Sequence, residues 1–136
     1  MADYIIGIDQ STQGTKALLF DSAGILIART DAVHEQLINE QGFVSHNPME
    51  IYHNTVKVVR ELVTKSGIQK SEVVGVGISN QRETSLVWDR TTGVPIDNAV
   101  VWQCSRGSAI CEELKKQGVA EGIQKKTGLP LSPYFP

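Results

Sequence analysis

The chain has 136 residues, with 13 basic and 15 acidic side chains and a formal net charge of −2 at pH 7. Hydrophobic residues make up 40% and charged residues 21% of it, which excludes a disordered or fibrous protein and indicates one globular domain with a single core. No basic face is apparent, so nucleic acid is not expected as a partner.

The first thirty residues predict three closely spaced strands. Residues 4–8 form a continuous apolar run of the kind found in a strand buried on both faces, and residues 16–20 and 25–30 form two further strands. Short polar turns separate them, which favours an antiparallel meander. Residues 31–46 lack a clear period, so we expect a loop there, with a short strand at 42–44.

The next segment carries the clearest helix signals. Asn47 is a favourable N-cap, Pro48 suits the first helical position, and Glu50 completes the pattern of a capping box. Apolar residues then recur at helical spacing as far as Gly67, which predicts the end of the helix. Residues 73–78 predict another buried strand. The order strand, strand, strand, helix, strand resembles the opening of the ribonuclease H-like fold of actin, in which the last strand lies parallel to the first.

The second half of the chain predicts shorter elements. Strands are expected at 84–88, near 94–96 and at 99–102, followed by a helix at 108–117 capped by Ser108 and a second helix at 119–126. The final residues, 133–136, are apolar and aromatic, whereas natural termini are usually polar and frayed. We therefore expect the sequence to be truncated.

Cysteine and histidine give no sign of a disulfide framework or a metal centre. Cys104 and Cys111 are too few for either, and we expect free thiols in a reducing cytoplasm. The three histidines are widely spaced and are expected to be at the surface or partly buried. The chain contains neither a signal peptide nor an apolar run of membrane-spanning length, so no membrane partner is expected.

The polar turn at residues 9–16 is a candidate phosphate site. Its backbone N–H groups and hydroxyls can cradle phosphate oxygens. Asp9, at the end of a strand, can hold Mg²⁺, and Lys16 can pair with phosphate as a point charge. On composition alone a plain polar hairpin is the simpler alternative, because the turn is not a Walker A loop.

A second candidate site follows the strand at residues 73–78, since binding sites cluster at strand ends in such sheets. Arg82 and Glu83 place a fork of donors beside a carboxylate acceptor, a combination that can bracket vicinal hydroxyls. Trp102 and Gln103 add an apolar wall and an amide. The simpler alternatives are an exposed ion pair between Arg82 and Glu83, and core packing for the tryptophan.

Several motifs in order resemble the glycerol kinases of the FGGY carbohydrate kinase family. They cover essentially the whole chain and lie at residues 42–51, 80–88, 92–95, 98–103, 110–115 and 127–135. The resemblance implies an α/β fold, the ribonuclease H-like (actin-like ATPase) N-terminal domain, with a mixed sheet and flanking helices. It divides the partial domain 1–136 into ribonuclease H-like strands with a crossover helix at 1–80 and a polyol-site insertion at 81–136.

The same resemblance implies ATP-dependent phosphorylation of glycerol to glycerol 3-phosphate. ATP and Mg²⁺ are then the cofactors, a small polyol and ATP the partners, and the protein a cytoplasmic homo-oligomer. The family's catalytic base, an aspartate, and its adenine-binding domain lie outside this sequence. The chain alone is therefore expected to be inactive.

Residue roles follow from the resemblance as well. It implies that Arg82, Glu83 and Tyr134 hydrogen-bond glycerol and that Trp102 packs against its carbon skeleton. It places the metal near Asp9, and the contacts to nucleotide or product phosphates at Thr12, Gln13, Gly14 and Lys16.

The phosphate turn departs from the usual glycerol kinase pattern. That pattern reads Asp-Gln-Gly-Thr-Thr-Ser-Ser-Arg, whereas residues 9–16 read Asp-Gln-Ser-Thr-Gln-Gly-Thr-Lys. The latter is closer to the wider family, including pentulose kinases. The ammonium of Lys16 is a point charge, whereas the arginine of the usual pattern can hold phosphate with two donors of its guanidinium.

The alternatives to a glycerol kinase are a kinase for another sugar or polyol such as xylulose, and a non-catalytic sugar-sensing module. An incomplete sheet leaves an open edge, so self-association of the chain is also expected.

Overall fold

The computed structural model describes residues 3–135, and the chain divides into two compact units. The first unit consists of residues 1–35 and 47–81, and the second consists of residues 36–46 and 82–136. Each unit is therefore built from two stretches that are separated in the sequence.

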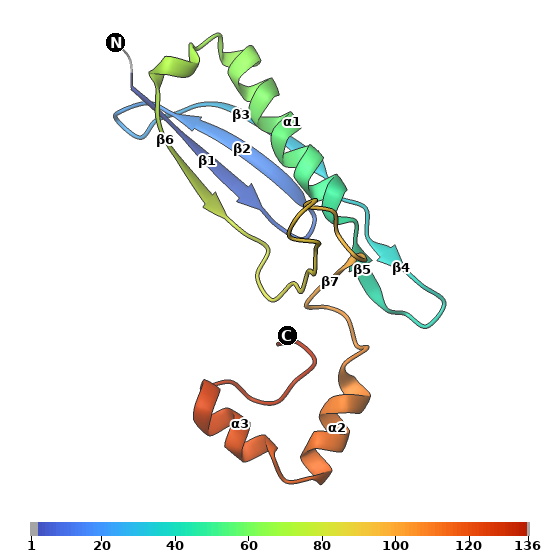
Figure 1. Ribbon diagram of the computed structural model, residues 1–136. Helices are drawn as coiled ribbons and strands as arrows, with labels where there is room; N and C mark the ends of the chain where they lie inside the picture. The colour runs from blue at the N-terminus through green and yellow to red at the C-terminus, as the bar shows by residue number, and fades with distance from the viewer. Residues whose placement is uncertain (1–2, 136) are drawn as a thin grey trace. The chain divides into compact units, whose positions relative to one another are not determined.

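The first unit contains a four-stranded sheet in the order β3-β2-β1-β6 (Figure 1). Its antiparallel meander consists of β1 (Tyr4–Gln10), β2 (Gly14–Phe20) and β3 (Leu26–Val33), and β6 (Val73–Ser79) pairs in parallel with β1. The meander and the parallel return strand expected from the sequence are confirmed. β3 extends into the expected loop because its last residues, 32 and 33, still pair with Thr15 and Gly14 of β2.

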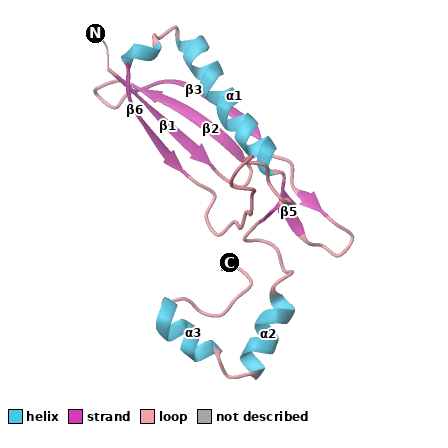
Figure 2. Ribbon diagram, in the orientation of Figure 1, coloured by secondary structure: helices cyan, strands magenta, loops and turns pink. Residues whose placement is uncertain are grey.

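Helix α1 (Pro48–Ser66) lies along one face of this sheet, over β2 and β3 (Figure 2). The Asn47 side chain accepts hydrogen bonds from two N–H groups of the first turn, and Gly67 ends the helix at a φ of 71°, as expected. The expected capping box is wrong. The Glu50 carboxylate instead accepts from the backbone N–H of Glu35, at 3.2 and 3.3 Å. A short 3₁₀ helix, η1 (Lys70–Glu72), leads into β6.

The core of the first unit lies between α1 and the sheet. Alternate residues of β1 and β2 meet one face of the helix, and the buried members are Ile6, Ile8, Ala17, Leu19, Val58 and Leu62. Each large aliphatic side chain buried in this way contributes roughly 1.5–3 kcal/mol. On β6 the side chains of Val74, Val76 and Ile78 are exposed, since α1 covers β2 and β3 instead. The burial expected for this strand is therefore wrong.

The second unit contains a small antiparallel sheet of β4 (Leu37–Ile38), β5 (Val44–His46) and β7 (Ala99–Val100). Two helices follow, α2 (Ser108–Lys116) and α3 (Ala120–Thr127). The strands expected at 84–88 and near 94–96 reduce to two isolated bridges, Ser85–Val100 and Trp88–Pro95. Ser108 is not the cap of α2: Gly107 occupies that position, and no side chain caps the helix.

Burial differs from the expectation for two of the histidines. His34 is 7% exposed and His46 is 0% exposed, so neither is a surface residue. Cys104 and Cys111 are free thiols, as expected, and both are buried. Among residues 3–135, no helix combines the length and apolar composition that crossing a bilayer requires.

Candidate functional site

The candidate phosphate turn is the hairpin between β1 and β2. The Ser11 N–H and the Ser11 hydroxyl both donate to the carbonyl of Gly14, at 2.9 and 3.0 Å. This pair of bonds closes the turn from within, so the Ser11 hydroxyl is engaged. Thr12 is half-buried and Gln13 is exposed at the tip. Their contacts with phosphate, and that of the Gly14 backbone, remain predictions.

Asp9 and Lys16 lie opposite each other in the register of β1 and β2. The Lys16 ammonium is 3.5 Å from Asp9 Oδ2, and the two side chains are 42% and 44% exposed. An ion pair this exposed is worth about 0–1 kcal/mol, so it yields easily to a stronger ligand. The residue expected near the metal and the residue expected to contact phosphate are therefore neighbours on one face of the sheet.

The donor set at this turn fits Mg²⁺. This ion is usually held by one or two carboxylates and completes its shell with water and substrate phosphates. Asp9 is a partly exposed carboxylate at a strand end, which suits that role. Within the described part of the chain no three His, Cys, Asp or Glu side chains form a ligand cluster, so a metal at Asp9 would take its other ligands from water and phosphate.

A partly buried network of hydrogen bonds beside the turn was missed by the sequence analysis. Thr15 Oγ1 lies 3.0 Å from His34 Nε2, and the Asn54 amide donates to His34 Nδ1 at 3.1 Å. With Nδ1 accepting, the ring proton sits on Nε2, so His34 donates to Thr15. Asn54 also donates to the Val33 carbonyl, and the His34 N–H donates to the Gln13 carbonyl at 3.0 Å. This network therefore fixes the backbone of Gln13 in the turn.

The candidate polyol segment follows β6 and begins at Arg82. Glu83 has a φ of 51°, and it is the one non-glycine residue between positions 3 and 135 with a positive φ. Backbone strain of this kind costs about 1–3 kcal/mol and is concentrated at functional sites. The ion pairs among the described residues include neither Arg82 nor Glu83, so the ion-pair alternative is wrong. Guanidinium and carboxylate are not neutralising each other.

Two of the four expected polyol residues are in contact. The rings of Trp102 and Tyr134 have centroids 5.5 Å apart and are tilted by 55°, and Phe135 meets Tyr134 edge-on at 4.9 Å. Trp102 is half-buried and Tyr134 is 39% exposed, so the pair forms a surface-accessible aromatic wall. Arg82 and Glu83 belong to the same unit. Their approach to the two rings is a prediction.

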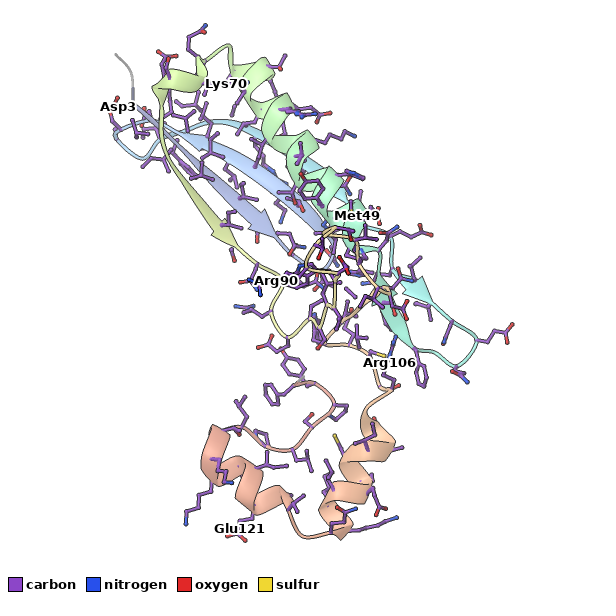
Figure 3. All side chains as sticks on the ribbon, viewed as in Figure 1. Asp3, Met49, Lys70, Arg90, Arg106 and Glu121 are labelled. Carbon is purple, nitrogen blue, oxygen red and sulfur yellow. The ribbon has the colours of Figure 1, made fainter. Side chains whose placement is uncertain are left out.

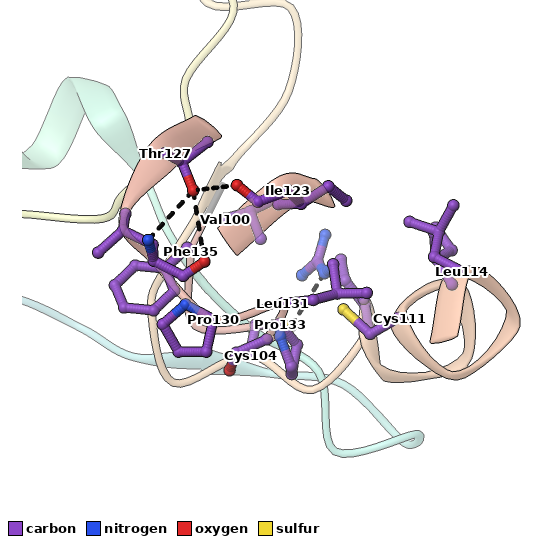
Figure 4. A pocket seen from close by; sticks show the side chains of 15 residues that line it. Val100, Cys104, Cys111, Leu114, Ile123, Thr127, Pro130, Leu131, Pro133 and Phe135 are labelled. Atoms are coloured by element: carbon purple, nitrogen blue, oxygen red, sulfur yellow. Dashed lines mark hydrogen bonds between the residues drawn. The ribbon is translucent and has the colours of Figure 1, made fainter. Parts of the chain in front are cut away.

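A cavity of about 460 Å³ in the second unit is a separate feature (Figure 4). It lies against α2, α3 and the segment after α3, and its lining is mostly apolar. Arg82, Glu83, Trp102 and Tyr134 are not among the residues that line it. An apolar cavity without these groups does not suit a triol, so we do not assign the polyol site to it.

Cys104 lies at this cavity beside Arg106, which is labelled in Figure 3. Arg106 Nε donates to Cys104 Sγ at 2.9 Å, and the same guanidinium donates to the Val44 carbonyl and the Ser45 hydroxyl. Burial raises the pKa of the Cys104 thiol, but hydrogen bonds from the backbone and side chain of Arg106 and from the Val44 backbone outweigh it and hold that pKa below its ordinary value.

The mixed sheet and its crossover helix have the architecture of an actin-like ATPase domain. The model of the FGGY family of carbohydrate kinases, N-terminal domain, matches residues 4–136, and the chain belongs to this family. The family resemblance and the actin-like fold expected from the motifs are thereby confirmed.

Glycerol kinases are among the curated relatives that this chain matches. Glycerol kinase 1 of Thermotoga maritima is 46% identical over 132 residues, and glycerol kinase of Thermoanaerobacter pseudethanolicus is 44% identical over 135 residues. These matches cover 97% and 99% of this chain but 27% of each relative. The chain therefore spans about a quarter of the length of these relatives.

Solved structures agree on the fold. The crystal structure of Plasmodium falciparum glycerol kinase with ADP is 35% identical with a TM-score of 0.88, and the match covers 98% of this chain and 27% of that one. The ligand-bound xylulose kinase of Lactobacillus acidophilus also gives a TM-score of 0.88, over 97% of this chain and 26% of that one, at 24% identity. This second likeness shows the fold alone.

Proposed function

We propose that this chain supplies part of the acceptor site of an ATP-dependent glycerol kinase, which converts glycerol to glycerol 3-phosphate. The observation that carries the proposal is the contact between the Trp102 and Tyr134 rings, since it brings together two of the four residues that are expected to bind the polyol and that lie far apart in sequence. The glycerol kinases among the relatives, 46% and 44% identical to the chain, support the choice of substrate.

The chemistry of a triol matches the expected groups. The Arg82 guanidinium would donate to hydroxyl oxygens, and the Glu83 carboxylate would accept from O–H groups. The Tyr134 hydroxyl would hydrogen-bond the triol, and the Trp102 ring would pack against its carbon skeleton. Holding the triol in this way orients one terminal hydroxyl, and orientation of this kind accounts for much of the rate in phosphoryl transfer. A carboxylate base from the rest of the protein would take the proton as this hydroxyl oxygen bonds to the γ-phosphorus of ATP. The bond from that phosphorus to the bridging oxygen would break, and ADP would leave with that oxygen.

The hairpin supplies the phosphate side of the reaction. Backbone N–H groups at Thr12, Gln13 and Gly14, together with Lys16, would hold phosphate oxygens. Bound Mg²⁺ at Asp9 would neutralise charge on the transferring group. The Lys16 ammonium gives a single point of attachment, so it tolerates more than one phosphate geometry. This tolerance favours a second candidate, a kinase for another sugar or polyol such as xylulose. The turn sequence, which is closer to the wider family including pentulose kinases, favours it as well.

Steady-state kinetics of the full-length protein that carries this chain test the proposal. We expect phosphorylation of glycerol with a higher kcat/KM than xylulose or erythritol. Trp102→Ala should raise the KM for glycerol about tenfold or more, equivalent to roughly 1.4 kcal/mol. Trp88→Ala is the matched control, because Trp88 is 56% exposed and belongs to neither candidate site. A preference for xylulose, or an equal loss in both variants, would refute the assignment.

A further inference from the structure

Two glutamine side chains join the end of β1 to the residue that precedes the polyol segment. The backbone N–H of Gln81 donates to Gln10 Oε1 at 2.9 Å. Gln10 Nε2 donates in return to Gln81 Oε1 at 3.4 Å and to the Ser11 carbonyl at 3.1 Å. One amide therefore contacts both the phosphate turn, at Ser11, and the main chain at Gln81. All three residues belong to the first unit.

The position of this contact follows from the sheet. β1 and β6 are parallel, and their register ends where Asp9 lies opposite Ser79. Beyond that pair no ladder bond between described residues connects the two strands, so the segments that follow them can diverge. The Gln10 side chain takes over there and accepts from Gln81, two residues past the end of β6. This side-chain hydrogen bond takes the place of the next backbone hydrogen bond that a longer ladder would form.

The segment that starts after Gln81 is the strained one. Arg82 and Glu83 follow directly, Glu83 with its φ of 51°. Beyond them Ser85 exchanges two backbone hydrogen bonds with Val100, each 2.9 Å long. A strained residue keeps its conformation only where its neighbours are held. Without the bond at Gln81, Glu83 could relax to an ordinary φ and its carboxylate would move.

We propose that Gln10 is a positioning residue for polyol binding, which it serves by fixing the main chain from which Arg82 and Glu83 project. The inference rests on the proposed function, because it assigns those two residues to the polyol. Gln10 touches neither substrate in this scheme and acts through Gln81. Its bond to Ser11 fixes the adjoining phosphate turn to the same amide.

Two substitutions separate positioning from mere support of the fold. Gln10→Met preserves the length and volume of the side chain but removes the acceptor for the Gln81 N–H. Gln10→Glu preserves an acceptor oxygen at the same distance and removes the two donor hydrogens. If the acceptor is what matters, the glutamate variant restores what the methionine variant loses. Gln124→Met is a matched control, since Gln124 is exposed on α3.

Calorimetric titration of the full-length protein with glycerol measures the affinity for the polyol. The protein is kept free of nucleotide, because Gln10→Glu introduces a carboxylate that would repel the charge of ATP. We expect the Kd for glycerol to rise about tenfold in Gln10→Met and to stay within about threefold of wild type in Gln10→Glu and Gln124→Met. Hydrogen exchange of the Gln81 amide should be faster in Gln10→Met alone. This second readout reports the bond itself and needs no ligand.

The outcomes distinguish the two hypotheses. If the wild-type protein binds no glycerol, the proposed function fails. If wild type binds glycerol and Gln10→Met binds it equally well, the positioning role is overturned while the proposed function stands. The role is also overturned if Gln10→Glu is as weak as Gln10→Met. Should Gln10→Met fail to fold, the comparison of Gln10→Glu with wild type decides, and a tenfold loss there contradicts the inference.

Discussion

Replacing Gly14 by alanine tests how the phosphate turn is built. Gly14 begins β2, is buried, and pairs with Val33 of β3. An added Cβ would lie 3.2 Å from both the Ala32 carbonyl carbon and Val33 Cα, and closer still to the Ala32 carbonyl oxygen. All three atoms are backbone, so no side-chain rotation can relieve the contact. The two strands have to move apart at the base of the hairpin.

The size of the effect follows from these contacts. Carbon atoms in proteins pack at about 3.5–4.0 Å, so the new methyl group is too close to three backbone atoms at once. Overpacking of this kind costs roughly 1–3 kcal/mol. The loss of glycine's freedom in the unfolded chain returns about 0.4–1 kcal/mol. We therefore expect Gly14→Ala to lower the free energy of unfolding by about 1–2 kcal/mol.

Urea unfolding of the 136-residue chain, followed by far-ultraviolet circular dichroism, measures this change. With a slope of about 2 kcal/mol per molar, the midpoint should fall by roughly 0.5–1 M. Gly75→Ala is the control in the same sheet, because nothing lies within 4 Å of its added Cβ. Its midpoint should stay level or rise slightly. If Gly14→Ala unfolds at the wild-type urea concentration, or Gly75→Ala loses as much, close packing of the hairpin is not what fixes Gly14.

Two further substitutions examine the second unit. Glu83→Gly should raise the melting temperature, because glycine adopts a φ of 51° at little cost, and it should abolish glycerol binding, because the carboxylate is lost. A thermal scan measures the first effect and a glycerol titration the second. A lower melting temperature would contradict strain at this residue. Arg106→Gln should raise the pKa of the Cys104 thiol, measured from thiolate absorbance during a pH titration in the Cys111→Ser background. The pKa of the Cys104 thiol in the folded state lies below its ordinary value of 9.0. The stability advantage of wild type over Cys104→Ser should therefore grow as pH rises toward 9.0, and it should disappear as pH falls through the folded-state pKa. A difference in stability that does not depend on pH would contradict the Arg106 contact.

Local signals made the first unit largely predictable. Asn47, Pro48 and Gly67 each act on the backbone within one turn of the helix, and all three do what the sequence indicates. Glu50 failed for the opposite reason. A capping box would join its carboxylate to the Asn47 N–H, but the donor that it binds, the Glu35 N–H, lies 15 residues away. A choice between a local and a distant partner depends on tertiary structure.

Less of the candidate sites could be predicted from individual residues. The Trp102–Tyr134 contact has no periodicity to reveal it, and only resemblance to a family suggested that these residues act together. The chain of bonds through His34 was missed because its partners, Thr15 and Asn54, lie on a strand and a helix. The Asp9–Lys16 pair could have been found, since a tight hairpin places those residues opposite each other.

The alternation of the two units along the chain has a consequence for synthesis on the ribosome. The meander of β1–β3 is complete at residue 33, but α1, which covers its apolar face, ends only at residue 66. At roughly 5–20 residues per second, a nascent chain would expose Leu19 and its neighbours for about 2–7 s. The β4–β5 hairpin waits longer, until Val100 arrives. Slow translation across residues 36–66 would therefore favour chaperone capture or aggregation over folding.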